Sequence, residues 1–119
     1  MRVVHFEIPA DDTARCITFY EKAFGWRFEK WDGPMPYWMI KTGEGDGIDG
    51  GMSARQQPAQ PPTNVISVAS VDDASKVILG AGGTVTAPKM GIPGIGWCAY
   101  FLDTEKNPFG IIQFDPSAA

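Results

Sequence analysis

The sequence is short of the residues that most often mark a metal site, a disulfide framework or a hydrolase triad. Its 119 residues include one histidine and two cysteines, Cys16 and Cys98, which do not form a CxxC spacing. The two cysteines are interpreted as small buried hydrophobic residues rather than as a disulfide pair. A serine-histidine-aspartate triad would have to use His5, and no nucleophile-elbow motif surrounds any serine.

Long hydrophobic runs and excess positive charge are also missing. No apolar run approaches the roughly 20 residues that a membrane-spanning helix needs. The formal net charge of −4 and the isoelectric point near 4.8 disfavour nucleic acid and anionic membranes as partners. The chain opens directly on a strand-like segment, without the charged head and apolar core of a signal peptide. We therefore expect a cytoplasmic protein without a nucleic-acid or membrane partner.

The sequence does contain a repeated pattern. Residues 4–12 (VHFEIPADD) and residues 65–73 (VISVASVDD) are strand-like runs that end in two aspartates. Each run leads into a helix-like segment closed by glycine. Aspartates at a helix start accept hydrogen bonds from its free amides, so capping explains them without catalysis. The repeat predicts a duplicated module.

Each module is predicted to fold as βαβββ from its hydrophobic periods and turn residues. In the first module the segments are a strand at 2–8, a helix at 13–24, and strands at 26–31, 37–41 and 48–53. In the second they are a strand at 64–69, a helix at 73–79, and strands at 84–87, 97–102 and 109–114. Three prolines and three glutamines between the modules have no hydrophobic period and predict a linker. The expected division is residues 1–54, linker 55–63 and residues 64–119, within one compact domain.

Several short motifs in this order resemble a known superfamily. They are HFEIP at 5–9, FYEK at 19–22, FGW at 24–26, GGTV at 82–85, IPGIG at 92–96 and DTEKN at 103–107. Over almost the whole chain they resemble the glyoxalase, bleomycin-resistance protein and extradiol dioxygenase proteins, the vicinal oxygen chelate superfamily. The resemblance implies an α+β fold in which two βαβββ modules curl an eight-stranded mixed sheet around a cleft, with the helices outside. Enzymes and plain binding proteins share this fold, so the fold alone does not set the function.

The resemblance also implies where a divalent metal would be held. Enzymes of the superfamily use a His, Gln or Glu on the first strand of each module, and carboxylates on the fourth strands. His5 matches the first position, but the repeat pairs it with Ile66. The fourth-strand positions fall on Gly110 and on Gly50 or Gly51, which have no side chain to offer.

Substitute ligands are few. Glu7, Asp49 and Gln113 are neighbours that could replace a lost ligand, but Gln113 stands three positions after Gly110. An odd shift along a strand points to the opposite face. Catalytic ions usually keep about three protein ligands. We therefore expect no cofactor, with a divalent metal as the less favoured alternative.

The remaining site residues are predicted from face and residue type. His5 and Glu7 share a strand face and form either a proton shuttle or, as we favour, a satisfied polar pair. Aromatics gather in the predicted cleft strands, where glycines would leave room for a flat guest. The predicted ligand-binding residues are His5, Glu7, Trp38, Trp97 and Tyr100.

No catalytic residue can be assigned from the sequence. The favoured function is a metal-free binding protein for a small hydrophobic or aromatic molecule. The alternatives are a metal-dependent lyase, isomerase or dioxygenase with atypical ligands, and a protein-interaction module. We also expect a homodimer, because a closed two-fold is the commonest assembly and a small aromatic-rich domain gains from burying more apolar surface.

Overall fold

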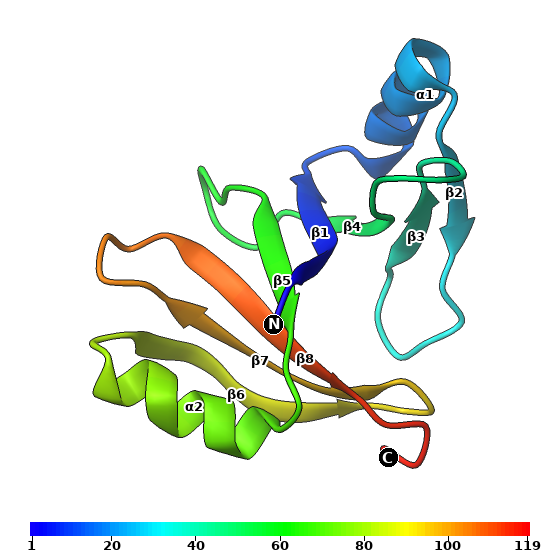
Figure 1. Cartoon of the computed structure of the whole chain (residues 1–119). Coiled ribbons are helices and arrows are strands. Elements are labelled where there is room, and N and C mark those ends of the chain that lie inside the picture. Colours follow the sequence, from blue (N-terminus) through cyan, green and yellow to red (C-terminus); the bar gives the residue numbers. More distant parts are fainter. The chain divides into compact units, whose positions relative to one another are not determined.

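The repeat in the sequence becomes a repeat of secondary structure in the computed structural model, which describes residues 1–119 (Figure 1). The first half contains β1 (Val3–Ala10), α1 (Thr13–Phe24), β2 (Arg27–Lys30), β3 (Trp38–Lys41) and β4 (Gly50–Ala54). The second half contains β5 (Thr63–Ser67), α2 (Val71–Gly80), β6 (Thr84–Ile92), β7 (Gly96–Leu102) and β8 (Pro108–Phe114). The predicted βαβββ modules and the α+β class are therefore confirmed.

The sheet is mixed, as predicted, and its strand order is β2-β3-β4-β1-β5-β8-β7-β6. In each half the first strand runs parallel to the fourth, β1 with β4 and β5 with β8. The other neighbours within each half are antiparallel: β2 with β3, β3 with β4, β6 with β7, and β7 with β8. The same pairing rules apply twice, so positions in the two halves can be compared strand by strand.

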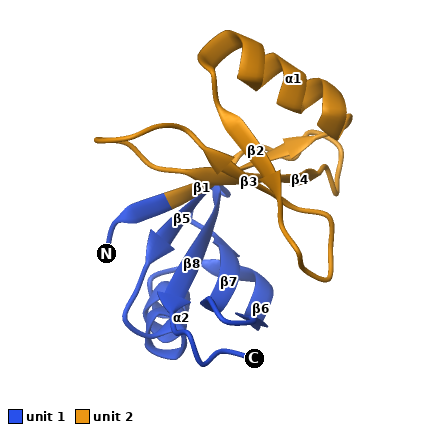
Figure 2. Ribbon diagram, turned by 90° about the vertical axis from the view of Figure 1, so that its right-hand side faces the viewer, with its two compact units in different colours: residues 1–4, 63–119 blue, residues 5–62 orange.

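The chain divides into two compact units, which are described separately here (Figure 2). The first unit is residues 5–62; the second unit is residues 1–4 with residues 63–119. The first residues of the chain belong to the second unit, where the amide of Ser67 donates to the carbonyl of Arg2 over 2.9 Å. The predicted linker is shorter than expected by one residue, because Thr63 already lies in β5.

The segment between the halves is fastened to the first unit by Arg55. Its amide donates to the carbonyl of Ala10 over 2.9 Å, and its Nε donates to the Asp11 carboxylate over 3.0 Å. Its guanidinium also donates to the carbonyl of Gln60. These contacts hold a stretch without regular structure against the end of β1.

In the first unit, local chemistry sets both ends of α1. The Asp12 carboxylate accepts from the amide of Arg15 over 3.0 Å, and Gly25 ends the helix in a left-handed conformation with φ of 72°. The helix packs beside a buried cluster of Ala10, Ile40 and Met52. Residues packed against this cluster include Phe6, Ile8, Cys16, Ile17, Trp26, Phe28 and Trp38. Since Phe6 and Ile8 point toward α1, His5 and Glu7 lie on the other face of β1.

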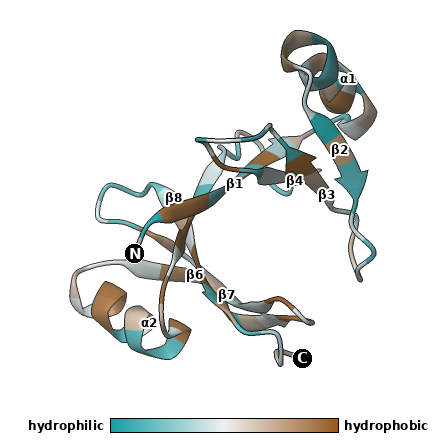
Figure 3. Ribbon diagram, turned by 45° about the vertical axis from the view of Figure 1, so that its right-hand side comes forward, coloured by the Kyte–Doolittle hydropathy of each residue, from teal (hydrophilic) through white to brown (hydrophobic).

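In the second unit, α2 lies against β6, β7 and β8. Its core is Val71, Ala99, Phe101 and Ile111, with Ile66, Val68, Ala74, Ile78, Trp97 and Phe109 packed against it. Both helices combine hydrophobic stretches with hydrophilic ones, as Figure 3 shows by colour. This amphipathic pattern is what a helix that covers one face of a sheet requires.

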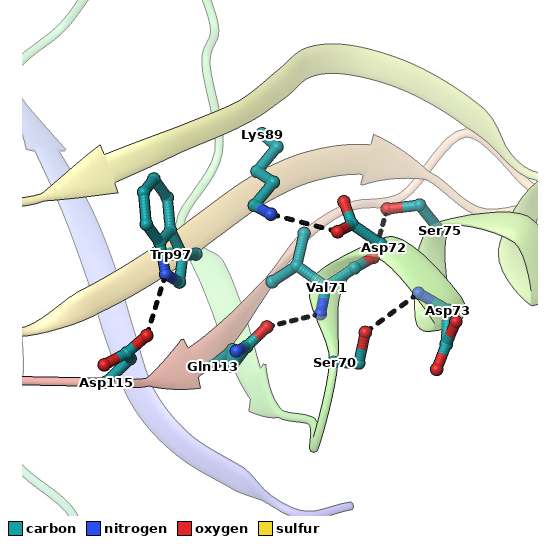
Figure 4. Close-up of polar contacts among 9 residues, drawn as sticks. All are labelled: Ser70, Val71, Asp72, Asp73, Ser75, Lys89, Trp97, Gln113 and Asp115. Atoms are coloured by element: carbon teal, nitrogen blue, oxygen red, sulfur yellow. Dashed lines mark hydrogen bonds and ion pairs between the residues drawn. The ribbon is translucent and has the colours of Figure 1, made fainter. Parts of the chain in front are cut away.

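The start of α2 differs from the prediction. The helix begins at Val71 rather than at residue 73, and its cap is Ser70, whose hydroxyl accepts from the amide of Asp73 over 3.1 Å. A second acceptor comes from β8, because the side-chain oxygen of Gln113 accepts from the amide of Val71 over 2.9 Å (Figure 4). Asp72 and Asp73 lie in the first turn, where negative charge favours the helix.

This capping arrangement predicts a measurable loss of stability. Ser70→Ala removes the acceptor for the Asp73 amide and should lower the free energy of unfolding by about 0.5–2 kcal/mol. Ser70→Asp keeps an acceptor and should lie close to the wild type. Urea unfolding of the three proteins measures the differences, and equal stability of Ser70→Ala and Ser70→Asp would contradict the role of the cap.

Candidate functional site

A chain of polar side chains lies on the face of the first unit's sheet that is turned away from α1. The hydroxyl of Tyr37 stands between two side chains of β1: His5 Nε2 is 2.8 Å away, and the Glu7 carboxylate is 3.0 Å away. All three side chains are half-buried. The structure therefore brings together His5 and Glu7, as predicted, through a residue that was not predicted.

Gly51 makes this arrangement possible. The register places Gly51 beside Glu7 on the neighbouring strand, so both lie on the same face. A β-carbon at Gly51 would overlap the hydroxyl of Tyr37. Any other residue at this position would exclude the phenol from the place where it meets both partners.

The turn before β3 positions Tyr37 at this site. The Tyr37 carbonyl accepts from the amide of Trp31 over 2.7 Å, which closes the turn between β2 and β3. The two rings meet edge to face, with centroids 6.1 Å apart. Tyr37 directly precedes Trp38, which points toward α1, so the alternation of a strand sends Tyr37 to the opposite face.

The direction of the hydrogen bonds follows from what each group can donate. The Tyr37 hydroxyl has one hydrogen, which it donates to the Glu7 carboxylate. His5 Nε2 must then donate to the hydroxyl oxygen, so this nitrogen carries a hydrogen. Burial lowers the pKa of His5 from its usual value, and the negative charges of Glu7 and Asp49 oppose this only in part.

The second unit also places a tyrosine over a glycine. Gly110 on β8 lies beside Val65 on β5 and Tyr100 on β7. A β-carbon at Gly110 would lie 2.8 Å from the Tyr100 ring. The expectation that glycines leave room for a guest is therefore corrected, because tyrosine side chains of the chain itself fill the space over Gly51 and Gly110.

Two positions predicted from the repeat are corrected by the register. Ile66 packs toward α2, so the residue of β5 on the face turned away from the helix is Val65. Val65 pairs with Gly110, whereas the residue beside His5 is Asp49, directly before the Gly50 partner of Phe6. The first-unit counterpart of Gly110 is therefore Asp49, not Gly50 or Gly51. The alignment of the two modules from the sequence was therefore wrong by one residue.

Asp49 is already engaged by its neighbours. Its carboxylate accepts from the amide and hydroxyl of Thr42 over 3.0 and 3.2 Å, and it lies 3.7 Å from Lys41 Nζ. The amide of Thr42, with lesser contributions from its hydroxyl and from Lys41, holds the pKa of the Asp49 carboxyl below its usual range. In neither unit do three His, Cys, Asp or Glu side chains gather in a way that could hold a metal ion.

The two tryptophans predicted for the site lie on helix-packed faces. Trp38 packs against the cluster beside α1, and Lys30 Nζ stands 5.8 Å from the centre of its ring. Trp97 packs against the core beside α2 and donates from Nε1 to Asp115 over 3.2 Å (Figure 4). Each tryptophan thus lies across its own sheet from the face that carries the Gly-Tyr pair, and this placement does not support a ligand contact.

Gln113 behaves as its odd spacing from Gly110 predicted. It pairs with Trp97, points to the helix-packed face and caps α2, so it is not a substitute metal ligand. Tyr100 lies on the face turned away from α2, as a cleft residue requires. Its contact with a ligand stays a prediction.

Tyr37 is the site residue that sequence reasoning missed. The signal available was a tyrosine just before a strand that also carries a tryptophan, together with a glycine pair on the next strand. The first unit also has two surface depressions of about 380 and 440 Å³, one beside Phe19 and the other beside Glu44. Neither is lined by the His5, Glu7 and Tyr37 group.

The sequence profile of the family described as bleomycin resistance protein-like N-terminal matches residues 2–43. No curated protein has a sequence that matches the chain. The helices α1 and α2 have 12 and 10 residues, and neither could span a membrane.

Solved structures resemble the chain closely in fold and weakly in sequence. Methylmalonyl-CoA epimerase from Mycobacterium tuberculosis has a TM-score of 0.74 at 10% identity, over 97% of this chain and 89% of that one. A variant of methylmalonyl-CoA epimerase from Streptomyces coelicolor, in complex with 2-nitronate-propionyl-CoA, has a TM-score of 0.71 at 14% identity, over 100% and 99%. A hypothetical protein from Bacillus halodurans C-125 has a TM-score of 0.75 at 9% identity, over 99% and 97%.

The lowered pKa of His5 predicts a pH dependence of stability. Because burial disfavours the charged ring, the unfolded chain takes up the proton first as pH falls below about 6.5. Stability is therefore greatest above that pH and declines from there down to the folded pKa. Urea unfolding at pH 7.5 and 5.5 should show a larger loss for wild type than for His5→Gln. An equal loss in both proteins would contradict the assignment to His5.

Proposed function

We propose that this chain, which has the fold of the glyoxalase, bleomycin-resistance protein and extradiol dioxygenase (vicinal oxygen chelate) superfamily, binds a small aromatic or hydrophobic molecule without a metal ion. The superfamily fold predicted from the motifs is confirmed by the structural matches. The observation that carries the proposal is the hydrogen-bonded chain of His5, Tyr37 and Glu7 over Gly51. The ligand would lie on this face of the first unit's sheet.

The chemistry of the site suits recognition of a mostly apolar guest. Ligand sites combine apolar walls with a few polar groups that fix orientation. His5 and Glu7 supply such groups from one strand, and Met39 lies in the same row of the sheet as Gly51 and Glu7. The glycine lets a flat ring lie against its backbone, in the place that the Tyr37 side chain takes in this structure.

The residues around His5 support binding without a metal. Its Nε2 is occupied by the Tyr37 hydroxyl, and the carboxylate of Asp49, directly before the fourth strand, is held by Thr42. The corresponding place in the second unit is Gly110, beside Val65. A metal at His5 would have to break the Tyr37 contact and draw Asp49 away from Thr42.

An enzyme of the same superfamily is the second candidate, favoured by the likeness in fold to methylmalonyl-CoA epimerases. It would be a metal-dependent lyase, isomerase or dioxygenase with atypical ligands. Elemental analysis and native mass spectrometry of the purified protein separate the two candidates. A metal near one per chain favours the enzyme, whereas a retained organic molecule favours the binding protein.

The binding site itself can be located by solution NMR. Titration with a panel of small aromatics that includes toluene, p-cresol and indole should shift the amide signals of Glu7 and Gly51 saturably. His5→Ala should weaken that binding by about 1–3 kcal/mol, because a desolvated polar partner is left without its bond. Glu21→Ala on the exposed side of α1 is the matched control and should bind as wild type does.

The proposal would be overturned by shifts confined to other parts of the chain. It would equally be overturned by equal affinity of wild type and His5→Ala for every aromatic in the panel. Unfolding curves of both variants check that each one keeps its structure.

We also propose that the chain forms a homodimer. Phe19 and Phe24 on α1 expose 58% and 63% of their surface, which a second copy would cover. Sedimentation equilibrium at micromolar concentration should give twice the 12.9 kDa mass of one chain. A single 12.9 kDa species would contradict this assembly.

A further inference from the structure

The space over Gly51 is filled by the chain's own phenol. The Tyr37 hydroxyl lies where a β-carbon of residue 51 would be, and it meets both His5 and Glu7 there. A ligand that uses His5 and Glu7 must therefore take the place of this hydroxyl or stay outside it. If the ligand takes the place of the hydroxyl, it must be able to form the same hydrogen bonds with His5 and Glu7.

We infer that Tyr37 is a displaceable internal occupant of the ligand site, and that the ligand carries a phenol-like hydroxyl which takes over its bonds to His5 and Glu7. This inference rests on the proposed function and names the class of ligand. Tyr37 is then a residue that determines specificity, because it sets the hydrogen-bond pattern that an incoming molecule must reproduce.

The two partners explain why a hydroxyl is required. Glu7 accepts a hydrogen, while the Nε2–H of His5 donates one, so the group between them must both donate and accept. A phenol or alcohol does both through one oxygen atom. A carboxylate would be repelled by Glu7, and a protonated amine has no acceptor for His5.

A ligand without a polar group would not replace the hydrogen bonds that the Tyr37 hydroxyl makes with His5 and Glu7. Desolvated donors and acceptors that lose their partner disfavour binding much more strongly than a missing apolar contact does. Toluene, which matches p-cresol except for the hydroxyl, should therefore bind this place poorly. The aromatic ring matches the ring of Tyr37, which already lies against the bare backbone of Gly51.

The position of Tyr37 in the chain is suited to displacement. It directly follows the turn at residues 32–36, whose side chains are all exposed, whereas Ile40 on the same strand is fully buried. Rotation of the Tyr37 side chain would disturb its edge contact with Trp31 but no part of the cluster beside α1. The backbone bond between Trp31 and Tyr37 can remain in place during this movement.

The second unit provides an internal contrast. Tyr100 lies over Gly110 in a similar way, but the β5 residue beside that glycine is Val65. Val65 can neither donate nor accept a hydrogen bond. The hydroxyl requirement is therefore inferred for the first unit, where His5 and Glu7 hold the phenol.

Variants of Tyr37 test the inference with p-cresol and toluene as probes. Tyr37→Ala empties the space, and p-cresol should bind it at least about tenfold more tightly than wild type, with shifts at the Gly51 amide. Tyr37→Phe keeps the ring but loses both hydrogen bonds, so its affinity for p-cresol should be intermediate. Toluene should bind Tyr37→Ala about tenfold more weakly than p-cresol does.

The outcomes separate this inference from the proposed function. If toluene and p-cresol bind alike near Gly51, the site binds aromatics but the hydroxyl requirement is wrong. If neither variant binds p-cresol more tightly than wild type, Tyr37 does not occupy the place of the ligand. If no aromatic shifts the Gly51 or Glu7 amides in any of the three proteins, the proposed function fails as well.

Folding of the variants is checked by circular dichroism and by urea unfolding. Tyr37→Phe preserves the ring that packs beside Trp31 and Gly51, so it serves where Tyr37→Ala does not fold. In that case the affinities of Tyr37→Phe and wild type for p-cresol are compared. Tighter binding of p-cresol to Tyr37→Phe supports the inference, and unchanged or weaker binding overturns it.

Discussion

The missing side chain at Gly51 is the constraint on which the site depends. With no β-carbon there, the phenol of Tyr37 crosses β4 and reaches two residues of β1 at once. Without this phenol, the half-buried His5 and Glu7 would each lose one hydrogen bond. The backbone of one glycine thus decides how the polar groups of a neighbouring strand are satisfied.

The alternation of strand faces determines which residues can join this site. In the first unit Phe6, Ile8 and Trp38 point toward α1, and in the second unit Ile66, Ala99 and Trp97 point toward α2. Every second residue of the central strands therefore packs against a helix. On these strands, an aromatic side chain can meet a ligand only if it lies on the face turned away from the helix, as Tyr37 and Tyr100 do.

Much of this architecture could be predicted from the sequence. The repeated strand, aspartates and glycine stop indicated the two modules, and period two correctly placed His5 with Glu7. Face assignment failed at Trp38 and Trp97, because tryptophan suits a ligand wall and a helix-packed core equally well. The register between modules was misjudged by one residue, since matching aspartates aligned Ile66 with His5 although Ser70, not an aspartate, caps α2.

Tyr37 could not be predicted, because its role depends on three segments at once. The turn after β2 must aim the ring, Gly51 must leave space, and His5 and Glu7 must stand two residues apart on the facing strand. None of these features alone distinguishes Tyr37 from Tyr100, whose ring also covers a glycine. The difference lies in the neighbouring strand, which offers His5 and Glu7 in one unit and Val65 in the other. Each unit thus places a tyrosine over a glycine, and in the first unit His5 and Glu7 of the first strand join that tyrosine in a polar chain.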